Sequence, residues 1–223
     1  MARPYQRKDA YHQQAKREGY RSRAAYKLIE IQRRAQVLRR GQRVIDLGCW
    51  PGGWMQVAAR EVGPDGRVVG VDLAAVDPAL EFANAIALRG DLSEAPVRQA
   101  VLAAVGGPAD VLLSDAAPKL TGVRATDRAH EEALLAAIEA ALPELLRPGG
   151  SLVLKLMEGP EAQAAEQRLR ARFAGARSLR PEASRKGTSE RYWLGTGFVG
   201  AASRAQRAEG KRRPSGGSEG EES

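Results

Sequence analysis

The sequence predicts an α/β protein whose central sheet is mostly parallel and carries helices on both faces. Short apolar segments of strand length alternate with longer segments in which apolar residues recur at helical spacing. Most neighbouring strands are separated by enough residues for a helical crossover, which parallel strands require. The chain has 223 residues, of which 43% are hydrophobic and 28% charged, and this suits one folded domain with a hydrophobic core.

Start and stop signals are clearest in the first half of the chain. Residues 1–20 are expected to form an extended or irregular basic segment. Ser22 is predicted to cap a helix that continues to about Arg40, because apolar residues step by three or four positions along it and Gly41 follows. Strands are then expected at residues 43–47, 67–73, 85–88 and 110–114, with helices at 54–62 and 96–105.

The second half departs from this alternation at its end. A helix rich in Ala, Leu and Glu is expected at 127–146, and the Arg-Pro-Gly-Gly segment at 147–150 ends it. Only a polar loop separates the last two strands, so the final strand should be antiparallel and form a hairpin with its neighbour. The remaining expected elements are a strand at 151–157, a helix at 161–174 and strands at 177–180 and 191–199, which completes a seven-stranded sheet.

Positive charge is concentrated at the N-terminus. The chain carries 35 Lys and Arg against 27 Asp and Glu, and residues 1–43 alone hold thirteen basic and three acidic residues. A basic segment on a nearly neutral body is typical of proteins that bind polyanions, and a solvated, charge-rich helix surface is the alternative. We therefore expect a basic arm at 1–21, a folded domain at 22–200 and a disordered low-complexity tail at 201–223.

Composition excludes several classes of protein. No apolar run approaches the ~20 residues that a membrane-spanning helix needs, and the polar first ten residues do not resemble a secretory signal. The single cysteine, Cys49, rules out a disulfide framework, and with two histidines in the chain a zinc site is not expected. We predict a cytoplasmic protein without a membrane partner and without a metal.

A glycine-rich turn follows the first strand, in the segment 46–54 (Asp-Leu-Gly-Cys-Trp-Pro-Gly-Gly-Trp). Its glycines, Gly52 among them, allow the backbone to approach a ligand, and the next helix directs its N-terminal amides toward that ligand. The Gly-x-x-x-Gly-Gly spacing differs from the Gly-x-Gly-x-x-Gly spacing of dinucleotide-binding loops. A looser loop with acids nearby suits a cationic nucleoside that carries an amino acid, such as S-adenosylmethionine.

Acidic residues stand after the next three strands. Asp72 is placed to accept hydrogen bonds from ribose hydroxyls, and Asp91 is placed to reach an adenine amino group. Asp115 follows the fourth strand. The alternative interpretation is that these acids cap turns, and Trp54 is equally compatible with a ligand contact and with a place in the core.

Charged residues also indicate a reaction centre. Lys155 lies among Val, Leu and Met in a central strand, where burial is costly unless the ammonium group is paired or functional. Neighbouring strands would bring Asp115 beside it, Glu190 would join from the last strand, and Lys27 would close the site from the first helix. The alternatives are a Lys155 whose ammonium group reaches solvent and a Lys27 that is simply a solvated helix charge.

Together these segments resemble the FtsJ/RrmJ-type 2′-O-ribose RNA methyltransferases, in particular those that modify a uridine of bacterial large-subunit (23S) ribosomal RNA. The matching segments follow one another in order and span residues 22–198. They are Ser22-Arg23-Ala24-Ala25-Tyr26-Lys27-Leu28, Asp46-Leu47-Gly48 with Pro51-Gly52-Gly53-Trp54, Ser114-Asp115-Ala116-Ala117-Pro118, Lys155, and Ser184-Arg185 with Ser189-Glu190-Arg191-Tyr192. Cys49 and Trp50 depart from the pattern, because relatives usually have two small residues there.

The resemblance implies a class I, Rossmann-like methyltransferase domain that uses S-adenosylmethionine. It implies in-line methylation of a uridine ribose 2′-hydroxyl, with Lys155 as the base provided that burial and nearby positive charge favour its neutral form. The implied partner is ribosomal RNA within the large subunit, and we expect a monomer. The implied catalytic tetrad is Lys27, Asp115, Lys155 and Glu190, and the implied cofactor-binding residues are Gly52, Trp54, Asp72, Asp91 and Asp115.

Other functions share part of these features. The basic arm and first helix would hold phosphates, with Tyr5, Tyr11 and Tyr20 available either to stack on bases or to anchor the segment. A small-molecule methyltransferase would not need that arm, and the glycine spacing disfavours a nicotinamide-dependent oxidoreductase. A 2′-O-methyltransferase acting on transfer RNA and a ribosome assembly factor that binds RNA without catalysis remain as alternatives.

Overall fold

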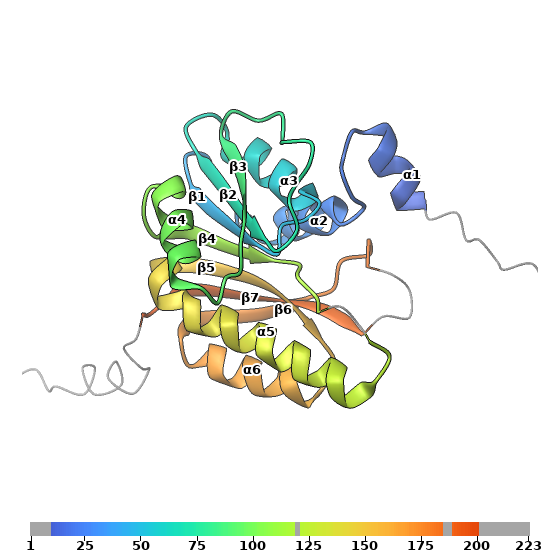
Figure 1. The fold of residues 1–223 in the computed structure, drawn as a ribbon, viewed down its shortest axis with the longest axis vertical. Helices are drawn as coiled ribbons and strands as arrows, with labels where there is room; N and C mark the ends of the chain where they lie inside the picture. The colour runs from blue at the N-terminus through green and yellow to red at the C-terminus, as the bar shows by residue number, and fades with distance from the viewer. Residues whose placement is uncertain (1–9, 119–120, 185–188, 201–223) are drawn as a thin grey trace, which may run out of the picture.

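The computed structural model describes residues 10–118, 121–184 and 189–200, and this part of the chain forms one seven-stranded sheet with helices on both faces (Figure 1). The strands are β1 (Arg43–Leu47), β2 (Arg67–Asp72), β3 (Ala85–Arg89), β4 (Ala109–Ser114), β5 (Leu146–Met157), β6 (Phe173–Leu179) and β7 (Glu190–Phe198). The helices are α1 (Ala10–Arg17), α2 (Ala25–Ala35), α3 (Gly53–Val62), α4 (Ala95–Val105), α5 (Arg124–Leu145) and α6 (Pro160–Arg170).

The strands follow the order β3-β2-β1-β4-β5-β7-β6. The first five in this order are parallel, and β7 is antiparallel to both β5 and β6, as predicted. The order reverses at β1, which has β2 on one side and β4 on the other. In such sheets ligands bind at this switch point, beyond the carboxyl ends of the strands. Because β7 runs the opposite way, its first residue, Glu190, lies at the same edge of the sheet and pairs with Met157.

Two hydrophobic cores sandwich the sheet. Helices α2 and α3 cover one face, while α4, α5 and α6 cover the other, with α5 and α6 side by side (Figure 1). Alternation along each strand supplies both cores; in β1, Val44 points to the α2 side and Ile45 to the α5 side. Burial of such a side chain stabilises the fold by about 1.5–3 kcal/mol.

The N-terminal segment differs from the prediction, because residues 10–17 form the helix α1 rather than an irregular arm. Its composition is polar, so local preference does not account for it. Instead, Ala15 is buried, and the rings of Tyr11 and Tyr20 lie 5.5 and 5.6 Å from that of Tyr26. Tertiary contacts therefore stabilise a helix that is too short to form alone, and both tyrosines anchor the segment. Tyr5, like the rest of residues 1–9, lies outside the described residues.

Helix α2 is shorter than predicted at both ends. Ser22 does not cap it, since its hydroxyl has no hydrogen-bond partner within the described residues. The helix ends at Ala35 because Gln36 turns into the left-handed region with φ 47°. The Gln32 side chain then bonds both the N–H and the carbonyl of Leu38, at 2.9 and 2.7 Å, so the chain folds back and buries Leu38.

Two further boundaries were wrong. Strand β5 begins at Leu146 rather than at residue 151, and β6 begins at Phe173 within the predicted last helix. Phe173 is fully buried, with its ring 5.3 Å from that of Trp193 and 5.2 Å from that of Phe198. This aromatic contact favours a strand over continuation of the helix. The remaining predicted elements are confirmed, with small differences at their ends.

Within the described residues there is neither a helix suited to span a membrane nor a cluster suited to bind a metal. In the described part of the chain, no helix is long and apolar enough to cross a membrane. Nor do the described residues contain a group of three or more His, Cys, Asp or Glu side chains arranged to hold a metal ion. The predicted tail at 201–223 and the polar run at 185–188 lie outside the described residues.

Candidate active site

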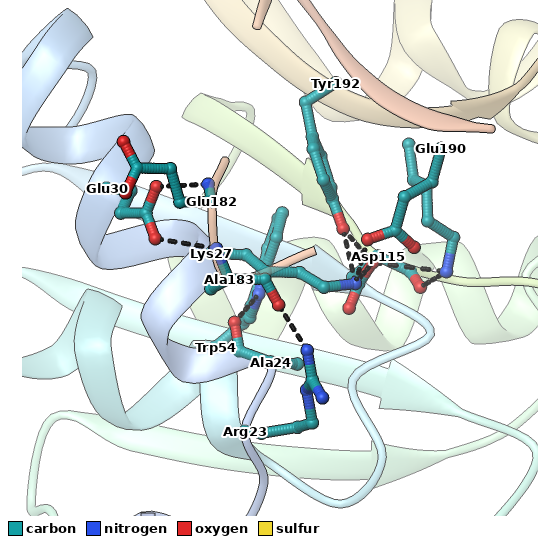
Figure 2. A network of polar contacts seen from close by, with 11 residues as sticks. Arg23, Ala24, Lys27, Glu30, Trp54, Asp115, Glu182, Ala183, Glu190 and Tyr192 are labelled. Atoms are coloured by element: carbon teal, nitrogen blue, oxygen red, sulfur yellow. Dashed lines mark hydrogen bonds and ion pairs between the residues drawn. The ribbon is translucent and has the colours of Figure 1, made fainter. Parts of the chain in front are cut away.

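Four side chains predicted to form a tetrad converge at the carboxyl edge of the sheet. Figure 2 labels three of them, Lys27, Asp115 and Glu190. Lys27 Nζ lies 2.9 Å from Glu190 Oε1 and 3.5 Å from Asp115 Oδ1. Lys155 Nζ lies 3.2 Å from Asp115 Oδ1 and also contacts the Asp115 carbonyl oxygen. All four side chains are at most 17% exposed. The structure therefore brings together residues that are up to 163 positions apart in the chain.

Strand pairing explains why they meet. The parallel register pairs Ser114 with Leu154, which places Asp115 beside Lys155. The antiparallel register of β5 and β7 pairs Lys155 with Tyr192. Because side chains alternate along a strand, Glu190 and Tyr192 project from the same face of β7. Lys27, in the first turn of α2, covers that face and is itself buried.

The segment before β7 is fastened to α2. The Glu30 carboxylate accepts hydrogen bonds from the backbone N–H groups of Glu182 and Ala183, at 2.6 and 2.9 Å (Figure 2). The Arg23 guanidinium donates to the Ala183 carbonyl oxygen. These contacts fix the helix that carries Lys27 against the chain that leads into β7.

Charge is balanced within the cluster. Two carboxylates and two ammonium groups lie within 3.5 Å of a partner of opposite sign. Burying ion pairs is costly, and replacement by apolar residues is often neutral or stabilising. Stability alone is therefore a weak reason for this arrangement, and a chemical role is the stronger one.

Tyr192 is a fifth member of the cluster that the sequence analysis did not assign. Its hydroxyl donates to Asp115 Oδ1 at 2.5 Å and accepts from Lys27 Nζ at 2.9 Å. Burial, reinforced by the negative charge of Asp115, raises the pKa of Tyr192 far above its usual value, so the phenol stays a proton donor. The available signal was its position two residues after Glu190, which places both on one face of the strand.

Glu190 is held in its charged form. Burial by itself would raise its pKa, but the nearby Ser184 hydroxyl and the neighbouring Lys27 ammonium lower the pKa overall. The carboxylate is thus ionised at neutral pH, where it can hold Lys27 in place or accept a hydrogen bond.

The glycine loop lies directly beside this cluster. Gly48 has φ 74°, and an added Cβ would lie 2.5 Å from the Cβ of Ala116, so only glycine lets the loop approach the residue after Asp115. Gly52, with φ 106°, precedes α3, where a Cβ would meet Leu80 at 3.2 Å and Arg21 at 3.3 Å. The predicted loop therefore has the close approach and left-handed backbone that its glycines suggest.

Asp72 ends β2 and Asp91 follows the adjacent strand β3, and Asp72 contacts the loop. The Asp72 carboxylate accepts N–H bonds from Trp50 at 3.0 Å and Ala74 at 2.8 Å. Asp91 accepts from the Ser93 N–H at 2.8 Å, and this bond lowers the pKa of Asp91. Both acids do cap turns, but a carboxylate has about four acceptor positions, so each retains capacity for a ligand.

The two tryptophans that flank the loop differ in environment. Trp54 is 3% exposed, donates from Nε1 to the Ala24 carbonyl at 2.8 Å, and has its ring 5.6 Å from that of Tyr192. These contacts favour the core interpretation and connect the loop with the tetrad. Trp50, in contrast, is 59% exposed.

Asp46 carries an unsatisfied carboxylate oxygen beneath the glycine loop. It is fully buried in β1, and its Oδ2 has no hydrogen-bond partner among the described residues. Burial, together with the charges of Asp115 and Asp72, raises the pKa of Asp46. An orphaned acceptor at the base of a glycine loop indicates that a ligand completes the site.

Comparison with known proteins identifies a family whose model covers most of the chain. The model of the FtsJ-like methyltransferase family matches residues 20–198. Two similar proteins carry the name ribosomal RNA large subunit methyltransferase E. The one from Halorubrum lacusprofundi is 43% identical over 192 residues, covering 86% of this chain and 71% of its own length. The one from Acidithiobacillus ferrooxidans is 41% identical over 195 residues, covering 87% and 88%.

Solved structures show the same fold. A Plasmodium falciparum protein described as a ribosomal RNA methyltransferase is 26% identical with a TM-score of 0.68, and the match covers 81% of this chain and all of that one. A fibrillarin from Aeropyrum pernix, solved with bound S-adenosyl-L-methionine, has a TM-score of 0.58 at 18% identity, covering 77% and 76%. The second likeness concerns the fold alone.

Proposed function

This chain belongs to the FtsJ-like methyltransferase family, and we propose that it methylates the 2′-hydroxyl of a uridine ribose in large-subunit (23S) ribosomal RNA. The chain is an enzyme that methylates RNA and uses S-adenosylmethionine as its cofactor. Relatives about 40% identical bear the name of a large-subunit ribosomal RNA methyltransferase, which supports ribosomal RNA as the substrate. The observation that carries the choice of a hydroxyl group is the buried cluster in which two lysines share the Asp115 carboxylate.

The residues present fit S-adenosylmethionine. The orphaned Asp46 oxygen and the adjacent acids suit a ligand that carries positive charge. The glycines give the loop its left-handed backbone and its close approach to the residue after Asp115. Asp72 and Asp91 would hold its ribose and adenine, with Gly52 and Asp115 nearby. When bound, this cofactor supplies an electrophilic methyl group.

Lys155 is the proposed base. A ribose hydroxyl is a weak nucleophile and must lose its proton on attack, so a basic group has to lie within hydrogen-bond reach. Lys155 Nζ contacts one carboxylate and one carbonyl oxygen, whereas Lys27 Nζ contacts two carboxylates and the Tyr192 hydroxyl. Lys155 Nζ therefore contacts fewer negatively charged groups than Lys27 Nζ does, and we assign proton acceptance to Lys155 Nζ.

The other members of the cluster position the reacting groups. Asp115 orients Lys155 through the 3.2 Å contact, and Tyr192 fixes Asp115 through its short hydrogen bond. Glu190 and Lys27 would hold the ribose and Lys155 in line with the methyl group. Alignment of this kind supplies a large part of the rate enhancement in displacement reactions.

The experiment that tests this function supplies the purified full-length protein with S-adenosylmethionine labelled in its methyl group. Naked 23S ribosomal RNA, assembled large subunits and transfer RNA are offered separately. We expect label on a uridine of 23S RNA, at a linkage that resists alkaline hydrolysis because the 2′-oxygen is blocked. Label on transfer RNA alone, or on a base, would contradict the proposed substrate, and the absence of label on every RNA would contradict catalysis.

We further propose that the protein acts as a monomer on ribosomal RNA in the cytoplasm, with the basic N-terminal residues contributing to RNA binding. Lys16 and Arg17 lie exposed in the last turn of α1, beside the aromatic cluster that anchors the helix. Such side chains neutralise phosphates without reading sequence. Light scattering of the protein alone, compared with its mass in complex with RNA, tests the monomeric state.

A further inference from the structure

A cavity of about 480 Å³ lies at the opposite end of the strands from the tetrad. It is bounded by the residues after α2, by the amino ends of β4 and β5, and by the hairpin of β6 and β7. Three arginines, Arg39, Arg147 and Arg177, line it together with a single acid, Asp110. None of the residues assigned to methyl transfer borders it.

An irregularity in the sheet builds this cavity. Ala109 pairs with Leu146, but the next pair along is Val111 with Ser151, so the four residues 147–150 stand opposite the single residue Asp110. Bulges of this kind redirect side chains and are found beside functional sites. Here the extra residues carry Arg147 and Gly149 into the lining.

Positive charge in the cavity is not balanced. Both carboxylate oxygens of Asp110 are already engaged, one by the Arg43 N–H at 2.7 Å and the other by Arg147 Nε at 2.6 Å. Within the described residues, no acidic side chain pairs with Arg39 or with Arg177. The lining therefore carries a net charge of two positive. Arginine presents a planar set of donors that suits the oxygens of a phosphate group.

Residues of α2, β5 and β7 contribute to both the cavity and the tetrad. Helix α2 supplies Lys27 to one and Ala35 to the other, and β5 supplies Lys155 and Ser151. We name these elements, with β7, the α2–β5–β7 seam. Four residues of strand span about 13 Å, so a small ligand cannot occupy both sites, whereas a polymer can reach both.

We propose that this cavity binds a backbone phosphate of the RNA substrate, at a nucleotide several positions away from the methylated ribose. The inference rests on the proposed function for the identity of the polymer. Concave shape, excess arginine and a location outside the reaction centre are what a positioning contact requires, because phosphate contacts set register without reading sequence. The cavity would thereby align a long RNA whose target ribose lies at the tetrad.

The test measures binding of a 23S RNA fragment to the full-length protein over a range of salt concentrations. Arg39→Gln and Arg177→Gln change exposed side chains, so the fold should persist. Each variant should weaken RNA binding several-fold and lower the slope of log affinity against log salt by about one. The turnover rate at saturating RNA should remain that of the unchanged protein.

The matched control is Arg168→Gln, which removes one positive charge from α6 on the opposite face of the sheet. If the two cavity variants bind RNA as Arg168→Gln does, the cavity is not an RNA site. Protection of the protein by inorganic phosphate without a change in the RNA salt slope would likewise overturn the proposal, since it would indicate a site for a free anion.

Failure of the proposed function would look different. In that case the unchanged protein would transfer no methyl group to any ribosomal RNA. A loss of salt slope in the Arg39 and Arg177 variants would still show that the cavity holds a phosphate of RNA. Normal methyl transfer with unaltered slopes would reject the cavity and leave the function standing.

Discussion

Charged side chains are paired and buried at one end of the α2–β5–β7 seam, whereas at the other end two arginines are exposed and, among the described residues, have no acidic partner. At the carboxyl end, each of the four charged groups of the tetrad lies within 3.5 Å of an opposite charge and is largely shielded from water. At the amino end, Arg39 and Arg177 face an open cavity whose one acid is already occupied. Balanced, desolvated charge suits directional chemistry, whereas unbalanced and exposed charge suits attraction of a polyanion.

Lys155→Met should produce the largest effect, because it removes the proposed base from the balanced end. We expect the turnover rate to fall by about 10²–10⁴-fold, the range for loss of a general base. RNA affinity and its salt slope should not change, which is the reverse of the expectation for Arg177→Gln. Methyl transfer under saturating RNA and cofactor measures the first quantity, and filter binding measures the second.

Arg170→Met is the control for this variant, since Arg170 is an exposed residue of α6 outside the tetrad and outside the proposed RNA contacts. It should retain the full turnover rate. Full methyl transfer by Lys155→Met, with an unchanged circular dichroism spectrum and unchanged cofactor affinity, would reject the assignment of the base.

Tyr192→Phe should have an intermediate effect. The change keeps the ring that packs on Trp54 and removes the hydroxyl that donates to Asp115. Loss of a hydrogen bond to a charged group costs about 1.5–3 kcal/mol, so the turnover rate should fall about 10- to 100-fold while KM for RNA stays constant. A rise in KM with an unchanged turnover rate would mean that Tyr192 binds RNA rather than positions Asp115.

Tyr26→Phe supplies the matched control. Its hydroxyl also donates to a carboxylate, Glu18 Oε2 at 2.8 Å, but this pair lies beside α1, away from the tetrad. This variant should lose some stability and keep the turnover rate. Equal losses of activity in both variants would show that a tyrosine–carboxylate hydrogen bond affects activity only through the stability of the fold.

Asp72→Asn should weaken the cofactor site alone. Removing the charge at the end of β2 weakens hydrogen bonds from a bound ribose and from the Trp50 N–H, so cofactor Kd should rise about 10-fold. The turnover rate at saturating cofactor should persist. Calorimetric titration measures Kd, with Asp65→Asn in the exposed turn before β2 as the control. An unchanged Kd would assign Asp72 to turn capping only.

Asp46→Asn should have the smallest effect, and a favourable one. The pKa of Asp46 is raised in the folded state, so between its unfolded and folded pKa values the native protein binds more protons and loses stability as pH rises. The amide removes this ionisation. In cofactor-free protein, the melting temperature of the variant should therefore exceed that of the unchanged protein by about 2–4 °C at pH 8, and by less at pH 5. A constant difference across pH would contradict it.

The sequence predicted the site better than it predicted the local structure around it. Asp115, Lys155 and Glu190 were placed together because the carboxyl ends of the parallel strands and the start of the antiparallel last strand lie at one edge of the sheet. Tyr192 was missed because an aromatic residue in a strand is ordinarily part of the core. Its partnership with Asp115 depends on the distance between two strands, which no local pattern contains.

Other differences share this cause. Helix α1 depends on the contacts of Tyr11 and Tyr20 with the ring of Tyr26 in α2. Strand β6 depends on the packing of Phe173 against Trp193. The Arg-Pro-Gly-Gly segment was interpreted as a helix stop followed by a turn, whereas the structure uses it as an insertion in β5 that opens the arginine-lined cavity. Each depends on residues distant in sequence, where turn and helix preferences give no information.

The environments of the tryptophans have a practical consequence. Trp54 and Trp193 are almost completely enclosed, whereas Trp50 stands in solvent with its backbone N–H bonded to Asp72. The three together account for every tryptophan in the chain. Tryptophan fluorescence that a dissolved quencher such as iodide removes must therefore come largely from Trp50 in the glycine loop. The intrinsic fluorescence of the unlabelled protein can thus follow ligand binding at this loop in real time.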